Sequence, residues 1–207
     1  MVFTRPPMVR WLAAGFLAVS AYFAWHHFVQ ARPIARGPGV VAAHAPVQQP
    51  LDREAPMFER DGFRIAVVAS FQMEARVIRS KSYCCAAPDR LAPIDVAFGW
   101  GRMSDETVLA RLDISQSGRF YFWRYEGSPP IPHREIEVSS ANMHLIPATK
   151  AIEKRLKNLR PGQIVTLRGY LVEVAGYDGF VWRSSLTRED TGNGACELIW
   201  VEELEAS

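Results

Sequence analysis

The tripeptide Asp190-Thr191-Gly192 is the sequence in which aspartic proteases carry a catalytic carboxylate. Those enzymes bring two such aspartates together, so that the two carboxylates share one proton. This chain has a single copy, so a homodimer would have to supply the second, and Thr187-Arg188-Glu189 is polar where the strand before the motif should be buried. Gly192 and Gly194 favour a turn with positive φ. We therefore expect a loop between two strands, in which Asp190 or Thr191 caps backbone N–H groups.

A second set of residues would suit a nucleophilic hydrolase. His144 would act as the base, Ser184 or Ser185 as the nucleophile, and Asp190 would orient the histidine. No Gly-x-Ser-x-Gly elbow accompanies them. A histidine hydrogen-bonded to a neighbouring loop would explain the same pattern, so we expect no catalytic set and keep the hydrolase as the alternative.

One predicted strand, from Phe120 to Tyr125, is aromatic on both faces, and it is accompanied by Arg119 and Arg124. Such rings and guanidinium groups could stack on sugar rings or bases. The alternative is a strand that is buried on both faces. We name as candidate binding residues Arg119, Tyr121, Trp123, Asn142, His144 and Arg188.

The sequence argues against several other kinds of site. Of the five histidines, His26, His27 and His44 precede the predicted domain, and His133 and His144 lack the paired spacing of metal ligands. We therefore expect no metal and no cofactor. The net charge is +2, but the first 57 residues carry +3 and the remainder −1, so we do not expect nucleic acid to be a partner of this nearly neutral remainder.

The chain has three cysteines, of which Cys84 and Cys85 are adjacent and Cys196 begins the last predicted strand. A Cys85–Cys196 or Cys84–Cys196 disulfide would form if the Cα atoms approach within about 7 Å. One thiol would then be left over. The alternative is three free cysteines, with Cys196 as a small buried apolar residue.

The amino-terminal part of the sequence predicts a membrane anchor. Residues 11–29 contain no charged side chain, and as a helix they would extend about 28 Å, close to the thickness of a bilayer core. We expect residues 1–10 to be a cytoplasmic N-terminus, 11–29 a transmembrane helix, and 30–57, with its five prolines, an extended tether. A cleaved signal peptide is the alternative. These features predict a single-pass protein of the bacterial inner membrane whose C-terminal domain is periplasmic. Disulfides persist in the periplasm.

Residues 58–207 predict the domain that positions the candidate site residues. Strand-like runs alternate with turns, and Thr149 to Leu159 has helical periodicity. A second short helix would begin at Ser104, and residues 93–101 are interpreted as an extended surface loop because of their proline and glycines. Asp178-Gly179 predicts a hairpin turn, and Gly169 inside a strand predicts a bend or a close backbone contact. The pattern is typical of an α+β fold, mainly β: a small, partly open OB-like barrel with one or two short helices.

Four segments resemble those of an uncharacterised family of bacterial membrane-anchored proteins. They are GWGRMSD (99–105), DISQSGRFYFWRY (113–125), SSANMHLIPA (139–148) and SSLTREDTGNGACELIWVE (184–202). The resemblance implies a cell-envelope context and no particular activity. Together with the anchor, it favours a membrane-tethered, non-catalytic binding or scaffolding domain with a protein or glycan partner, and an envelope hydrolase as the alternative.

Overall fold

The computed structural model of the chain describes residues 16, 19–20, 22, 32–51 and 55–207. Within these ranges no helix is long and apolar enough to cross a membrane. Most of the predicted transmembrane segment, and all of the predicted cytoplasmic N-terminus, lie outside the described residues. The chain divides into two compact units, Met1–Arg32 and Pro33–Ser207, of which the second contains the sheet.

The unit Pro33–Ser207 is an α+β domain that is mainly β. Its strands are β1 (Val47–Gln49), β2 (Met57–Arg60), β3 (Phe63–Ser82), β4 (Ile94–Gly99), β5 (Asp113–Ser117), β6 (Phe120–Arg124), β7 (Ser140–Pro147), β8 (Ile164–Gly176), β9 (Val181–Arg183) and β10 (Glu197–Ala206). Its helices are α2 (Ala87–Leu91), the 3₁₀ helix η1 (Gly101–Ser104), α3 (Glu106–Leu109), α4 (His133–Val138) and α5 (Lys150–Lys157).

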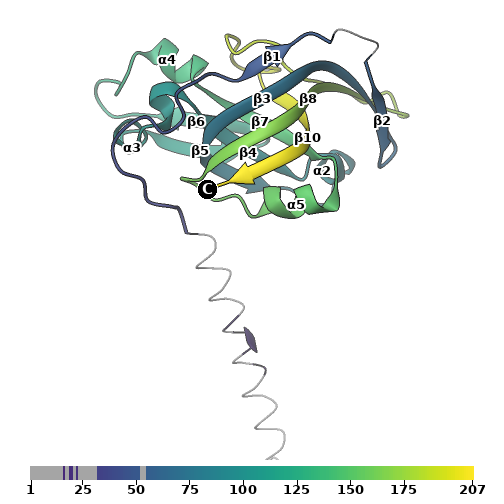
Figure 1. The fold of residues 1–207 in the computed structure, drawn as a ribbon, viewed down its shortest axis with the longest axis horizontal. Coiled ribbons are helices and arrows are strands. Elements are labelled where there is room, and N and C mark those ends of the chain that lie inside the picture. The colour runs from purple at the N-terminus through teal and green to yellow at the C-terminus, as the bar shows by residue number, and fades with distance from the viewer. Residues whose placement is uncertain (1–15, 17–18, 21, 23–31, 52–54) are drawn as a thin grey trace, which may run out of the picture. The chain divides into compact units, whose positions relative to one another are not determined.

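Five long strands form the body of the sheet, in the order β3-β4-β7-β10-β8, and β8 also pairs with β3. The pairing of β7 with β10 is parallel, and the other pairings in this series are antiparallel. The short strands β1 and β2 pair with β3, and β9 pairs with β8. Figure 1 shows β3, β8 and β10 side by side, with α5 near the end of β10.

Side chains that point inward and outward alternate along the strands, and the inward ones form the core. In β3 the alternate side chains from Phe63 to Ala75 are buried, as the period of two predicts for one inward face. Helix α5 adds Ile152 and Leu156 to the same core, and the Thr149 hydroxyl accepts a hydrogen bond from the Ile152 N–H at its start. The structure thus confirms the predicted helix, which ends two residues before Leu159.

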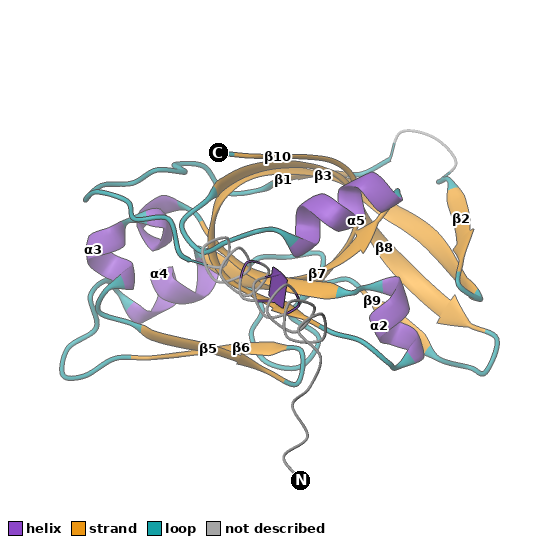
Figure 2. Ribbon diagram, turned by 90° about the horizontal axis from the view of Figure 1, so that it is seen from below, coloured by secondary structure: helices purple, strands orange, loops and turns teal. Residues whose placement is uncertain are grey.

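The β5–β6 hairpin forms a separate two-stranded sheet. Figure 2 shows it with α3 and α4 at one end of the fold. Met103, Val108 and Ile136 pack there in an apolar cluster of their own, and Ile114 and Trp123 of the hairpin lie against that cluster. Apolar packing fixes the hairpin at this end, and polar contacts hold its turn at Arg119.

Two sequence-based predictions about elements were wrong. Residues 93–101 contain a central strand, β4, in which every side chain is buried, because β3 and β7 pair with both of its edges. Its last residue, Gly99, leaves no room for a side chain, because a Cβ there would lie 2.2 Å from the Met103 carbonyl oxygen. The cap of α3 is Asp105, whereas the Ser104 hydroxyl accepts hydrogen bonds from Val41 and Ala42.

The predicted tether, 30–57, is in large part bound to the domain. The Ile34 N–H donates to the Pro161 carbonyl oxygen over 2.8 Å, and the Arg36 guanidinium donates to the Gly162 carbonyl oxygen over 2.7 Å. Ala42 is fully buried, and β1 extends the sheet at β3. The prolines keep this segment extended, and its N–H groups find acceptors on the domain surface.

Candidate functional site

Two neighbouring cavities lie where the hairpin, β7 and the 184–196 loop meet. The first, the hairpin cavity, has a volume of about 190 Å³, and its lining includes Tyr121, Trp123, Asn142, Arg188, Asp190 and Glu197. The second, the arginine cavity, has a volume of about 400 Å³, and its lining includes Arg119, His144, Trp182 and Arg183. Phe120 and Cys196 line both cavities, so the two are contiguous.

The structure places all six candidate binding residues at these cavities. Four of them line the hairpin cavity, and Arg119 and His144 line the arginine cavity. The aromatic strand is not buried on both faces: Phe120 and Phe122 are 38% and 51% exposed. Its outward face is therefore available to a ligand.

A tight turn aims Arg119 into the arginine cavity. Gly118 and Arg119 connect β5 to β6 with φ of 57° and 67°, the positive values that a two-residue hairpin turn requires. Glycine adopts such values readily, but arginine does so at a cost in strain. The surroundings hold the strained residue: its N–H donates to the Tyr83 hydroxyl over 3.2 Å, and its carbonyl oxygen accepts from Asn142 over 2.9 Å.

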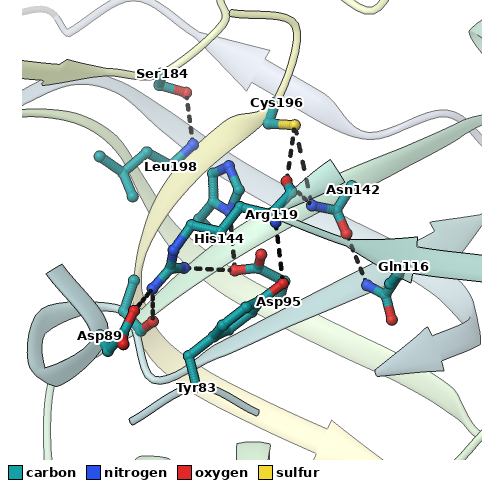
Figure 3. Close-up of polar contacts among 11 residues, drawn as sticks. Tyr83, Asp89, Asp95, Gln116, Arg119, Asn142, His144, Ser184, Cys196 and Leu198 are labelled. Carbon is teal, nitrogen blue, oxygen red and sulfur yellow. Dashed lines mark hydrogen bonds and ion pairs between the residues drawn. The ribbon is translucent and has the colours of Figure 1, made fainter. Parts of the chain in front are cut away.

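Arg119 belongs to a polar cluster in which a buried carboxylate is the centre (Figure 3). Its guanidinium donates to Asp95 over 2.9 Å and to Asp89 over 2.7 Å. The same oxygen of Asp95 lies 2.8 Å from Nδ1 of His144. Asp95 is fully buried and His144 is only 4% exposed, so this charged network lies largely out of water.

Aromatic rings enclose the Arg119 guanidinium on two sides. Its central carbon lies 4.3 Å from the ring centroid of Tyr83 and 5.1 Å from that of Trp182. The ring of His144 packs against Trp182, with 4.8 Å between centroids. Burial, and next the charge of Asp95, raise the pKa of Tyr83 to about 12. The phenol therefore stays protonated and can donate a hydrogen bond.

The hairpin cavity contains a second buried ion pair. Oε1 of Glu197 lies 2.5 Å from Nε of Arg188, and the Glu197 side chain is 1% exposed. Burial raises the pKa of Glu197 to about 7, although the positive charge of Arg188 opposes the shift. The adjacent thiol of Cys196 is also affected: burial, followed by the charge of Glu197, raises its pKa to about 12. Cys196 is therefore a thiol, and a poor nucleophile, at neutral pH.

Replacing Glu197 with glutamine is expected to flatten the dependence of stability on pH. The folded state holds a proton on Glu197 up to about pH 7, whereas an unfolded glutamate loses it near its ordinary pKa of about 4.3. The wild-type free energy of unfolding should therefore fall by roughly 3 kcal/mol more than that of the variant between pH 4 and pH 8. Urea unfolding of both chains across this range measures it, and parallel curves would contradict the assignment.

The residues of the alternative hydrolase fall into two groups. Ser185 donates to Asp190 over 2.7 Å, and Ser184 accepts from the Leu198 N–H over 3.0 Å. His144 instead pairs with Asp95, and no hydrogen bond in the described part of the chain joins it to the two serines or to Asp190. The predicted capping by Asp190 or Thr191 is not seen: Asp190 accepts from the Ser185 hydroxyl, and in the described residues no backbone N–H donates to either side chain.

All three cysteines are free, so neither predicted disulfide is present in the structure. Cys84 and Cys85 are exposed in the loop before α2, where their sulfur atoms approach each other to 2.8 Å. Cys196 is half-buried, and its sulfur lies 3.9 Å from Nδ2 of Asn142. The two adjacent cysteines therefore contact each other, and Cys196 lies in a separate polar environment.

Sequence reasoning missed the acidic members of the site. Asp95, Asp89 and Glu197 were not named, although an aspartate inside the apolar run of β4 was a signal for the first. In the residues that the structure describes, no group of three or more histidine, cysteine, aspartate or glutamate side chains could hold a metal ion. Comparison of the chain with models of protein families, with curated proteins and with solved structures finds no match.

Proposed function

We propose that Pro33–Ser207 is a binding domain for a glycan and that the hairpin and arginine cavities are its site. The observation that carries this proposal is a set of buried acceptor oxygens without a hydrogen-bond partner among the described residues: Oδ2 of Asp95, Oε1 of Gln116 and Oε2 of Glu197. Glu197 lines the hairpin cavity, and the other two belong to side chains that bond lining residues. Buried polar atoms require partners.

A glycan matches these groups in both its polar and its apolar parts. Its many hydroxyl groups are donors, which Oε2 of Glu197 in the lining of the hairpin cavity lacks, and the faces of its rings can stack on Tyr121 and Trp123. The arrangement of the five long strands supports the same proposal. We infer that it is of the OB type, in which one face of the barrel and its loops bind oligosaccharides or oligonucleotides.

The location of the domain remains a proposal from the sequence. We propose that residues 11–29 anchor the chain in the bacterial inner membrane and that the domain faces the periplasm, where cell-wall glycan would be its ligand. An active C-terminal alkaline phosphatase fusion would support this orientation, and an inactive one would contradict it.

The binding proposal predicts that Trp123→Ala weakens glycan binding about fivefold, because one stacking contact typically contributes about 1 kcal/mol. The experiment titrates the purified full chain with soluble fragments of cell-wall glycan and follows tryptophan fluorescence. Tyr177→Ala is the matched control, since Tyr177 is 76% exposed and lies outside both cavities. Equal loss in the two variants, or no saturable change with any fragment, would refute the proposal.

A second candidate function is glycan hydrolysis, and the Asp95–His144 pair is the observation that favours it. A carboxylate bonded to Nδ1 of a histidine orients the imidazole as a general base. Cys196, which also lines the arginine cavity, is a protonated thiol at neutral pH, so the nucleophile in this proposal is a water molecule. New reducing ends in the titrated samples, lost in His144→Gln while binding persists, would establish hydrolysis, and unchanged fragments would exclude it.

A further inference from the structure

The loop before α2 brings two thiols together at the protein surface. Cys84 and Cys85 are adjacent in the sequence, both are exposed, and their sulfur atoms lie 2.8 Å apart. Adjacent side chains of an extended segment normally point to opposite sides. Here Cys85 has a φ of 90°, a value that residues with a Cβ rarely adopt, and this backbone turns its side chain back toward Cys84.

Such strain is maintained by contacts on both sides of the pair. Before it, the Tyr83 ring packs on the Arg119 guanidinium, and the Tyr83 N–H donates to the Pro93 carbonyl oxygen over 2.9 Å. After it, Asp89 accepts a hydrogen bond from the Ala86 N–H over 3.1 Å and pairs with Arg119. The two thiols therefore lie between the two segments that hold Arg119 in the arginine cavity.

We propose that Cys84 and Cys85 are a redox site at which a disulfide-bearing oxidant forms a disulfide between neighbouring residues. The thiolate of one cysteine attacks the oxidant, forms a mixed disulfide and releases one thiol of the oxidant. The thiolate of the second cysteine then attacks the sulfur of the first and releases the other thiol. The protein loses two protons and two electrons, and the oxidant is reduced to two thiols.

The geometry favours this closure over attack by separate oxidant molecules on each thiol. A disulfide needs a separation of about 2.05 Å, so the sulfur atoms are already close, and because adjacent Cα atoms lie only about 3.8 Å apart, closure shifts the backbone at 84–85 as well as the side chains. The pairing is also independent of Cys196. The sulfur of Cys196 accepts a hydrogen bond from Asn142 and donates one to the Arg119 carbonyl oxygen, and contacts neither of the two thiols. Closure would stiffen the loop that connects Tyr83 to α2, and Tyr83 and the α2 residue Asp89 both contact Arg119.

The test treats the full chain carrying Cys196→Ser with an aromatic disulfide, 5,5′-dithiobis(2-nitrobenzoate), and analyses tryptic peptides by mass. Cleavage after Lys81 and Arg90 gives one peptide that contains both cysteines. We expect this peptide to carry no adduct and to be lighter by two hydrogen atoms, with two aromatic thiols released per chain. Cys84→Ser and Cys85→Ser are matched controls, and each should retain one adduct.

The competing outcomes are distinct. Two adducts on the same peptide would overturn the proposal, because they show that the two thiols react separately. A disulfide between two chains would overturn it as well.

The link to the arginine cavity has its own measurement. The Arg119 N–H donates to the Tyr83 hydroxyl, so hydrogen exchange of the backbone at 118–120 should slow in the oxidised chain. The exchange should not change in Cys85→Ser after the same treatment. Equal exchange in the oxidised and reduced chains would refute the link, whatever the state of the thiols.

Discussion

Replacing Gly169 with alanine is expected to lower the free energy of unfolding by at least about 3 kcal/mol. A Cβ at this position would lie 1.9 Å from the Trp200 carbonyl oxygen, and the obstructing atom is backbone, so no side-chain rotation relieves the overlap. Gly169 lies in the middle of β8, opposite Phe71 on β3 and Val201 on β10. The substitution would therefore force two paired strands apart.

The measurement is urea unfolding of the full chain, and Gly37→Ala is the matched control. A Cβ added at Gly37 would meet no atom within 4 Å, and this glycine does not require positive φ, so its replacement should change stability by no more than about 0.5 kcal/mol. If both alanine variants unfold at the same urea concentration, the close contact at Gly169 is not required by the fold. Because β10 begins at Glu197, displacement of this strand should also disturb the hairpin cavity.

The sequence predicted those parts of the fold that depend on local pattern. A glycine inside an apolar strand predicted the close contact at Gly169, and the structure confirms it. Helix α5 and the turn at Asp178-Gly179 were predicted from periodicity and turn chemistry, and both are present. The prediction for β4 failed because its proline and glycines were interpreted as loop signals, whereas pairing on both edges decides its conformation.

The sequence predicted several side chains of the candidate site but not the residues with which they interact. Asn142 and His144 were both named as candidate binding residues, and both reach the polar cluster. The partner of His144 was missed because Asp95 is 49 residues away in the sequence, and only the register of β4 against β7 places the two directly opposite each other. The same limit applies to the tether, whose acceptors at Pro161 and Gly162 are distant in sequence.

Replacing Asp95 with asparagine is expected to lower the free energy of unfolding by about 3 kcal/mol, the usual effect of removing one partner from a buried ion pair. The fully buried carboxylate accepts from both Arg119 and His144, and asparagine supplies no charge to balance the guanidinium. Arg119 would keep its pair with Asp89, which is why we do not expect complete unfolding. Urea unfolding at pH 7 measures the loss.

Asp113→Asn provides the matched control, because Asp113 pairs with Arg124 on the same hairpin while both side chains are mostly exposed. An exposed pair contributes at most about 1 kcal/mol, so the control should lose far less stability. Equal losses would show that burial of Asp95 does not distinguish it from a surface carboxylate. A larger loss in Asp95→Asn, by contrast, would show that the buried carboxylate stabilises the fold through its pair with the Arg119 guanidinium, which lies against the rings of Tyr83 and Trp182.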